Sequence, residues 1–332
     1  MASQVPRVFP APKVLAVVAP LRKDGALPSF CFGTDEKPID VGQCQIYAVK
    51  FPNGETWAIR IPVHAGSTLT PNGLSSIVED EIVTLTRMSD SGIRWSPRLI
   101  GGDHGIDNGL GHPYLALSWI PGTVLEWSST QPAKPEQRQK VLHQLVDIQL
   151  ELAQCTKESR PGTSATRYLT DIVDGKIERF KRGDLPELDL QSCLLHRELI
   201  IVDHEYNITG IIGWVFARFC PLQLALRLPR FLAIDPDVND PAPLPPGFST
   251  SATGSIQPSA ELLADRQYTI SHLSDIDSQP DSLASLMKTV VSAPNVDWQD
   301  LVYNSCFSKG LHRWMSERSW LLDASSKEIT IT

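Results

Sequence analysis

The stretch Leu195-His-Arg-Glu-Leu-Ile-Ile-Val-Asp203, followed closely by Tyr206-Asn-Ile-Thr-Gly-Ile-Ile-Gly-Trp214, decides the fold. Residues 194–202 and 207–215 are apolar runs, and the polar residues His204-Glu-Tyr-Asn207 separate them. Two short apolar runs joined by a polar turn are typical of a pair of antiparallel strands. The sequence therefore predicts a β-hairpin here.

The residues before this hairpin predict a small lobe built of strands and one helix. Residues 45–51 and 56–61 are β-rich and are joined by an Asn-Gly turn, which predicts another hairpin. Residues 75–88 place apolar side chains three and four positions apart, and three acidic residues at 79–81 indicate an acidic helix start. A strand over residues 114–120 then ends in a Pro-Gly pair, where we expect a hinge.

The remaining sequence predicts a larger, mainly helical lobe. The strongest helical pattern covers residues 135–155, with apolar side chains on one face. Further helices are expected over residues 168–180, 259–274, 281–292 and 297–318. Proline, serine and glycine are frequent in residues 235–258, which favours an extended insertion or lid over packed structure.

These elements suggest a division of the chain into an arm and two lobes. We expect an N-terminal arm over residues 1–30, an N-lobe over 31–120, and a C-lobe over 121–325 that carries the insertion. The prolines of the arm exclude a long regular helix, and residues 14–18 are expected to add one strand or a cover.

The composition is that of an ordinary globular protein with an acidic balance. Lysine and arginine number 30 against 38 aspartate and glutamate residues, a net charge of −8. This sign argues against nucleic acid or an anionic membrane as the main partner. The six cysteines show no metal-site or paired spacing, so we expect free thiols, and without a signal or spanning segment a cytoplasmic protein. The oligomeric state is left open.

The hairpin and its flanking residues closely resemble the catalytic loop and metal-binding strand of aminoglycoside-phosphotransferase-like and choline kinases, especially fungal ones. The upstream order agrees: Gly42 lies near the phosphate-loop hairpin, Arg60 takes the place of the phosphate-binding basic residue, and Glu81 that of its helical partner. Residues 119–122, Trp-Ile-Pro-Gly, match the hinge. The resemblance covers roughly residues 40–235 and implies an α+β, bilobal protein-kinase-like fold, with a small antiparallel sheet plus helix and a larger helical lobe.

The same resemblance implies that the phosphate-transfer machinery is damaged. Kinases of this type use a loop Asp to orient the nucleophile and an Asp and an Asn to hold Mg²⁺. Here Glu198 replaces the loop Asp, and Gly213 replaces the metal-binding Asp. The loop is also shorter by about four residues and lacks its Asn. Asp203 could replace that Asn if no gap is assumed, but the apolar run before it favours a turn position instead.

The candidate site residues follow from these matched positions. We assign Glu198 and His196 as the acid/base pair, with the alternative that His196 only satisfies backbone groups. Arg60 and Glu81 could position a ligand or could be a structural pair that braces sheet and helix. The remaining substrate-binding candidates are Trp119, Asp203 and Trp214. We expect no metal and no cofactor.

Two other groups of residues have ordinary structural explanations. Asp103, His104 and Asp107 lie in a Gly-rich connection, where turn formation is favoured over a metal site. Tryptophans such as Trp57 could line an aromatic pocket, although core packing is commoner in strands.

These assignments lead to a first hypothesis and two alternatives. The chain would be a kinase-fold protein that has lost ATP phosphotransfer and binds a small organic molecule in the interlobe cleft. It could catalyse a metal-free acid/base rearrangement, a cyclisation or an isomerisation, in a biosynthetic pathway. The alternatives are a non-catalytic pseudokinase that acts as a binding or scaffold protein, and a residual small-molecule phosphotransferase.

Overall fold

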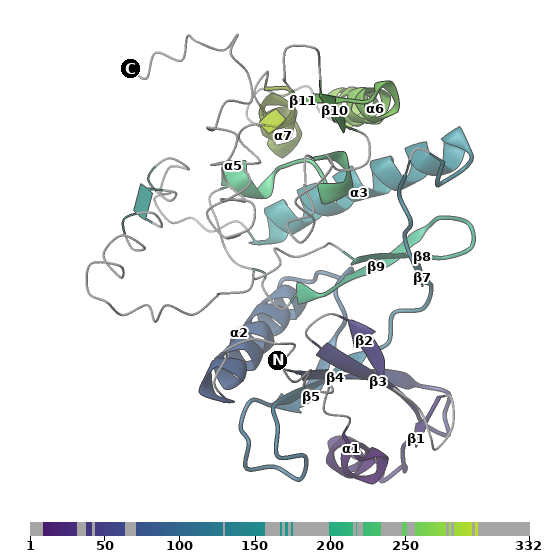
Figure 1. Cartoon of the computed structure of the whole chain (residues 1–332), viewed down its shortest axis with the longest axis vertical. Coiled ribbons are helices and arrows are strands. Elements are labelled where there is room, and N and C mark those ends of the chain that lie inside the picture. Colours follow the sequence, from purple (N-terminus) through teal and green to yellow (C-terminus); the bar gives the residue numbers. More distant parts are fainter. Residues whose placement is uncertain are drawn as a thin grey trace. The chain divides into compact units, whose positions relative to one another are not determined.

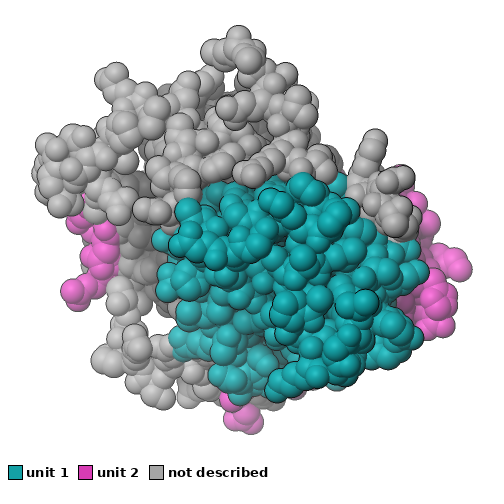
Figure 2. All heavy atoms as spheres, turned by 90° about the horizontal axis from the view of Figure 1, so that it is seen from below, with its two compact units in different colours: residues 1–122, 209–218 teal, residues 123–208, 219–332 magenta. Residues whose placement is uncertain are grey.

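Two compact units make up the chain, Met1–Gly122 with Thr209–Arg218 and Thr123–Ile208 with Phe219–Thr332, as coloured in Figure 2. The computed structural model describes residues 9–31, 38–41, 44–63, 71–128, 130–156, 167, 170, 171, 174, 199–214, 217, 222–233, 248–250, 256–276, 279, 282–293 and 296–297. Within these residues, no helix is both long and apolar enough to cross a membrane.

The first unit is built on an antiparallel sheet (Figure 1). Its strands run in the order β1-β3-β4-β6-β5, and β2 also pairs with β3. Their bounds are β1 (Ser29–Phe30), β2 (Ile39–Val41), β3 (Cys44–Lys50), β4 (Thr56–Pro62), β5 (Leu99–Asp103) and β6 (Tyr114–Ser118). Strands β3 and β4 form the predicted first hairpin, with Lys50 opposite Thr56, and Gly54 takes a φ of +85° in the turn. That prediction is confirmed.

One face of this sheet is covered by the N-terminal segment. Tyr47, Ile59 and Ile61 alternate with residues of the other face and pack into one core with α1 (Ala11–Val18), which the turn η1 (Ala19–Leu21) follows. Tyr47 also accepts a hydrogen bond from the Phe9 backbone N–H at 3.2 Å. Residues 14–18 therefore provide a cover, which was the second of the two expected alternatives, and they do so as a helix. Proline is compatible with a first helical turn, whose N–H groups lack partners anyway, so the prolines around residues 10–12 permit a short helix.

The long helix α2 (Pro71–Asp90) begins earlier than its pattern predicts. Its acidic residues 79–81 lie in the helix interior, so the expected acidic start was wrong. A proline at the first position suits helix initiation because its fixed φ is already helical. The buried positions of α2 follow three- and four-residue spacings and are Leu74, Val78, Glu81, Leu85 and Met88.

The segment Thr209–Arg218 belongs to the first unit although it is distant in sequence. The backbone N–H of Ile211 donates to the Trp95 carbonyl at 2.7 Å. Gly210 packs against Ile120 so closely that a Cβ atom there would lie 2.5 Å from the Ile120 Cδ1. A residue with a side chain at this position would therefore require the Ile120 side chain to move.

The second unit is mainly helical (Figure 1). Helices α3, α6 and α7 pack around a core that includes Leu142, Leu232, Leu273 and Met287. The remaining elements are short. A three-stranded sheet has the order β7-β8-β9, and residues 209–212 of β9 belong to the first unit. The bounds are β7 (Thr123–Val124), α3 (Pro135–Thr156), β8 (Leu199–Val202), β9 (Ile208–Ile212), α5 (Leu222–Ala225), η3 (Arg230–Leu232), β10 (Phe248–Thr250), β11 (Ile256–Pro258), α6 (Ala260–Ile276) and α7 (Leu283–Val291).

Most sequence expectations for this region can be compared with the structure. Strands β8 and β9 confirm the decisive hairpin, and α3, α6 and α7 confirm three predicted helices. Strands β10 and β11 pair as a small antiparallel sheet within residues 235–258, and the expectation of an extended insertion or lid there stays a prediction. The predicted helices over 168–180 and 297–318 lie almost entirely outside the described residues.

The described architecture is α+β, as predicted from the resemblance. It combines an antiparallel sheet plus one long helix with a mainly helical second unit. The exact bounds of the expected arm and lobes stay a prediction.

Candidate functional site

The candidate site in the first unit centres on a buried ion pair between Arg60 and Glu81. Arg60 lies on β4 and alternates with Ile59 and Ile61, so its side chain leaves the opposite face of the sheet. Glu81 occupies the buried stripe of α2, where its neighbours are apolar. The Arg60 Nη1 donates to Glu81 Oε2, and the two side chains are only 7% and 2% exposed.

Burial dominates the electrostatics of this pair. It raises the pKa of the Glu81 carboxyl, and the neighbouring Arg60 opposes that rise. Burial also raises the pKa of the nearby Cys44 thiol, which Arg60 again opposes. The thiol is therefore held in its neutral form and is a poor nucleophile.

One terminal nitrogen of the Arg60 guanidinium, Nη2, is buried and lacks a hydrogen-bond partner among the described residues. A buried cationic donor without a partner is costly, and such groups call for an explanation. An anionic oxygen from a ligand would satisfy it.

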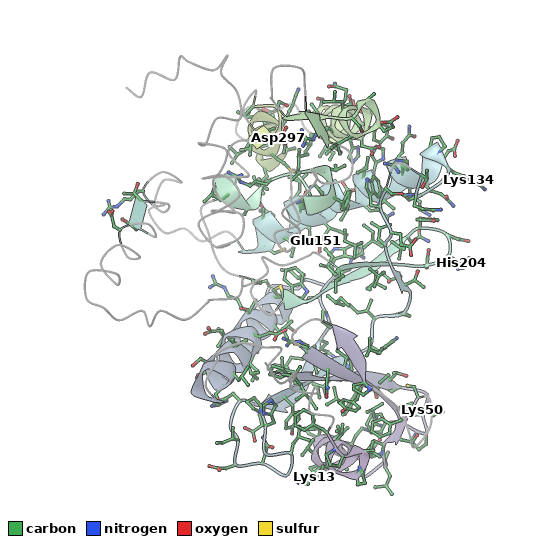
Figure 3. All side chains as sticks on the ribbon, viewed as in Figure 1. Lys13, Lys50, Lys134, Glu151, His204 and Asp297 are labelled. Carbon is green, nitrogen blue, oxygen red and sulfur yellow. The ribbon has the colours of Figure 1, made fainter. Side chains whose placement is uncertain are left out.

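Asp203 belongs to the second unit and organises the turn that follows β8. Its Oδ1 accepts from the backbone N–H groups of Glu205 at 2.9 Å and Asn207 at 2.8 Å. Its Oδ2 accepts from the Asn207 side chain at 2.8 Å, and this bond is the main reason that the pKa of Asp203 is lowered. His204 marks the exposed part of this turn in Figure 3. The prediction that Asp203 begins a turn is confirmed.

Gly213 and the two candidate tryptophans lie in the first unit. Gly213 has a φ of +89°, a conformation that residues with a side chain rarely adopt. The Trp214 Nε1 donates to the Ile211 carbonyl at 2.7 Å, and the Trp119 backbone N–H donates to the Thr56 carbonyl at 3.1 Å. Both tryptophans are half-buried.

The structure thus brings together two of the seven predicted site residues, Arg60 and Glu81. Trp119 and Trp214 make separate backbone contacts in the same unit, and Asp203 lies in the other unit. The catalytic candidates His196 and Glu198 lie outside the described residues, as does Gly42. The roles assigned to all these residues stay predictions.

Asp103 and Trp57, for which the sequence favoured a structural role over a functional one, have that structural role. Asp103 Oδ1 accepts from the Gly105 N–H at 2.8 Å, which confirms its use in a turn. Trp57 is 3% exposed and belongs to the core. The described cysteines Cys44 and Cys155 are free thiols. No group of three candidate metal ligands occurs in the part of the chain that the structure describes.

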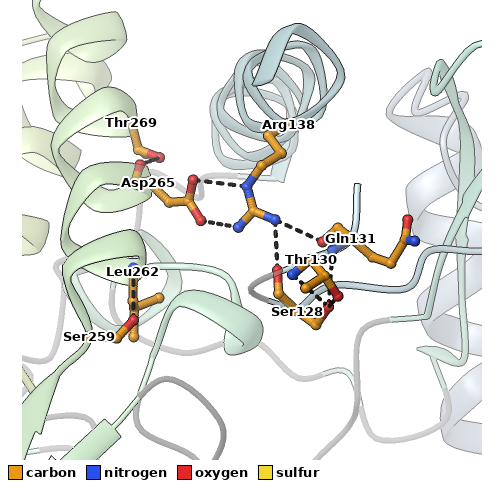
Figure 4. Close-up of polar contacts among 8 residues, drawn as sticks. All are labelled: Ser128, Thr130, Gln131, Arg138, Ser259, Leu262, Asp265 and Thr269. Atoms are coloured by element: carbon orange, nitrogen blue, oxygen red, sulfur yellow. Dashed lines mark hydrogen bonds and ion pairs between the residues drawn. The ribbon is translucent and has the colours of Figure 1, made fainter. Parts of the chain in front are cut away.

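Two features of the structure were not found from the sequence. Cys44 could have been placed beside Arg60, because the hairpin pairs Ile46 with Arg60 and Cys44 shares the face of Ile46. The second feature is Arg138 on α3, which joins Asp265 on α6 to the loop carbonyls of Ser128 and Gln131 (Figure 4). No local pattern predicts such a contact between distant helices.

Comparison with solved structures finds that this chain is similar to several phosphotransferases. The ternary complex of streptomycin, ATP and APH(2″)-IIa aligns with 94% of this chain and 95% of its own, at 8% identity and a TM-score of 0.47. Aminoglycoside 2′-phosphotransferase-IIIa aligns with 86% of this chain and 90% of its own, at 14% identity and a TM-score of 0.42. Macrolide 2′-phosphotransferase type I aligns with 91% of this chain and 95% of its own, at 13% identity and a TM-score of 0.42. The chain is similar to these phosphotransferases.

The search of curated sequences gives a shorter match. Clavilactone A biosynthesis cluster protein Y from Ampulloclitocybe clavipes is 34% identical over 86 residues. This segment is 26% of the present chain and 21% of that protein. No family model matches the chain.

Proposed function

We propose that this chain is a kinase-fold protein that has lost ATP phosphotransfer and binds a small organic molecule through Arg60. The observation that carries the proposal is Gly213 at the matched metal-binding position. It offers no side-chain ligand, and its φ of +89° disfavours any residue that could supply one.

The described residues do not fit the Mg²⁺ that a kinase of this family would hold. Mg²⁺ prefers carboxylate and phosphate oxygens in a near-ideal octahedron. Asp203, the other candidate carboxylate, already accepts hydrogen bonds on both of its oxygens within its own turn. Neither matched position therefore supports metal binding.

The buried Arg60 donor supports the second half of the proposal. A guanidinium recognises carboxylate and phosphate oxygens through directed N–H groups, and it keeps its charge when buried. The Glu81 partner fixes the Arg60 side chain and leaves Nη2 for a ligand. A ligand with an acidic or enolisable group fits this donor best.

Proton transfer by Glu198 and His196 completes the proposed activity. A carboxyl and an imidazole can rearrange a bound molecule by cyclisation or isomerisation, while Arg60 stabilises developing negative charge. A place in a biosynthetic pathway is supported by the relative from A. clavipes that matches over 86 residues, because that relative is a biosynthesis cluster protein.

The test is ligand capture with the full chain. The purified protein is incubated with a metabolite extract, separated from free molecules, and analysed for bound compounds by mass spectrometry. We expect an acidic small molecule to be retained by the wild type and lost in Arg60→Met. Arg98→Met is the matched control, because the Arg98 side chain is 68% exposed in the same unit.

The other outcomes decide between the alternatives. Retention of nucleotide only with Mg²⁺ would overturn the proposal in favour of a residual phosphotransferase. Absence of any retained molecule would favour the scaffold alternative. Equal retention by a folded Arg60→Met variant would show that the ligand site does not involve Arg60.

A further inference from the structure

A column of three aromatic rings joins α3 to α6 within the second unit. The imidazoles of His143 on α3 and His272 on α6 are stacked, with centroids 3.6 Å apart and planes 19° apart. Tyr268 stacks on His143 at 4.9 Å and 13°. Tyr268 and His272 are four residues apart on α6, so they present one face to α3.

Charged groups surround this column on both helices. Asp147, one turn beyond His143 on α3, has its Oδ1 3.4 Å from the His272 Nε2. That nitrogen is buried and has no hydrogen-bond partner among the described residues. Asp275 on α6 is a second carboxylate that acts on His143.

The solvent side of the column is an open hollow in the same unit. His143 and Tyr268 line it together with Glu136 and Lys140 of α3 and with Asn207. The Lys140 ammonium donates to the Glu205 carbonyl at 3.0 Å. Protons from solvent can therefore reach His143, and one cation and one carboxylate of α3 share its hollow.

Two imidazoles at this separation cannot both be charged without strong repulsion. Asp147 lies at ion-pair distance from His272, and its side chain is 62% exposed beside that ring. Burial and the neighbouring His272 lower the pKa of His143, and Asp147 and Asp275 oppose this shift. Interacting groups of this kind take up protons as a pair.

We propose that the stacked imidazoles of His143 and His272 hold α3 against α6 while His143 is neutral, and that protonation of His143 loosens this contact as the pH falls below about 6.5. The direction of this pH dependence follows from the number of protons that the folded and unfolded chains bind at residue 143. Below the ordinary histidine pKa of about 6.5, the unfolded chain binds a proton at residue 143 that the folded chain excludes. Stability of the helix pair is thus complete above that pH and decreases with acidification.

Hydrogen exchange of the full chain, measured by mass spectrometry at pH 7.5 and 5.5, tests the proposal. After correction for intrinsic rates, the opening constant of α3 and α6 amides should rise by up to about tenfold in the wild type. His143→Phe keeps a ring for stacking but cannot titrate, and it should remove this rise. His204→Gln, at an 89% exposed histidine, should keep it, and α2 amides serve as the internal reference.

Nuclear magnetic resonance of the imidazole carbons gives a second readout that does not depend on stability. We expect His143 to titrate below pH 6.5 in the wild type and at a higher pH in His272→Phe, where the like charge is gone. Titration of His143 at or above 6.5 in the wild type would overturn the proposal. An equal rise in opening constant in wild type and His143→Phe would overturn it as well.

Discussion

Glu81 is a carboxylate in a helix stripe whose other members are apolar. The stripe residues Leu74, Val78, Leu85 and Met88 are all buried, and Glu81 is 2% exposed. Such a position is tolerated because Arg60 provides the opposite charge. Removal of one partner leaves the other charge buried and unpaired.

Glu81→Gln should therefore lower the free energy of unfolding by about 3 kcal/mol, although it is nearly isosteric. Urea denaturation monitored for the first unit measures this. In a double-mutant cycle, Arg60→Met with Glu81→Leu should cost less than the sum of the two single changes. A loss below about 0.5 kcal/mol for Glu81→Gln would mean that the pair is not a brace.

The acid/base assignment makes a separate prediction for Glu198 and His196. Once a substrate has been captured, Glu198→Gln should reduce turnover by about 10² to 10⁴ and leave the melting temperature unchanged. His196→Ala should also reduce turnover. Steady-state rates of both variants measure this. Near wild-type turnover in both variants would place the chemistry at other residues.

At the scale of secondary-structure elements, Arg138 joins two helices and a loop. Its Nη1 donates to the carbonyls of Ser128 at 2.7 Å and Gln131 at 2.8 Å, while Nε and Nη2 donate to Asp265. The guanidinium also lies 4.3 Å from the Trp127 ring centroid. All of these groups belong to the second unit. Figure 4 shows the hydrogen bonds of Arg138.

Arg138→Leu should lower the free energy of unfolding by about 2–3 kcal/mol, because the partly buried Asp265 carboxylate loses its charged donor. Lys134→Ala, at an exposed lysine just before the same helix, should change it by less than about 0.5 kcal/mol. Chemical denaturation compares the two. Equal effects would show that the Arg138 contacts add little to stability.

The sequence predicted best those elements whose defining pattern lies within a short stretch of the chain. The hairpin of β3 and β4 has its own turn residues, and α3 has a complete apolar stripe. Residues 14–18 were assigned to a strand or cover because β-branched residues also suit strands, whereas packing against Tyr47 and Ile59 favours a helix. The pairing of β10 with β11 depends on contacts between segments that composition does not report.

Residues of the candidate site could be predicted only where a position of this chain matches a motif of the phosphotransferase family that it resembles. Arg60 and Glu81 were assigned from the resemblance, and the structure pairs them. The contact between His143 and His272 joins residues that are distant in sequence, so no spacing rule could find it. The register of the hairpin did contain the position of Cys44, because it fixes which residues share a face.

At the scale of the whole molecule, the response to nucleotide tests the loss of phosphotransfer. A ligand at 100 times its dissociation constant would stabilise the chain by about 2.7 kcal/mol. We expect millimolar ATP with Mg²⁺ to give no such shift in a thermal melt, because Gly213 supplies no metal ligand. A melting temperature that rises with ATP only when Mg²⁺ is present would contradict this.

The return of residues 209–218 to the first unit has a consequence for the order in which the chain is made. Ile211 and Gly210 contact Trp95 and Ile120, yet the ribosome produces them only after residues 123–208. At about 5–20 residues per second, the nascent first unit waits several seconds for its last segment. A fragment that stops at Gly122 therefore leaves the Trp95 carbonyl without this backbone donor, and co-expression with a peptide of residues 209–218 is the natural way to complete it.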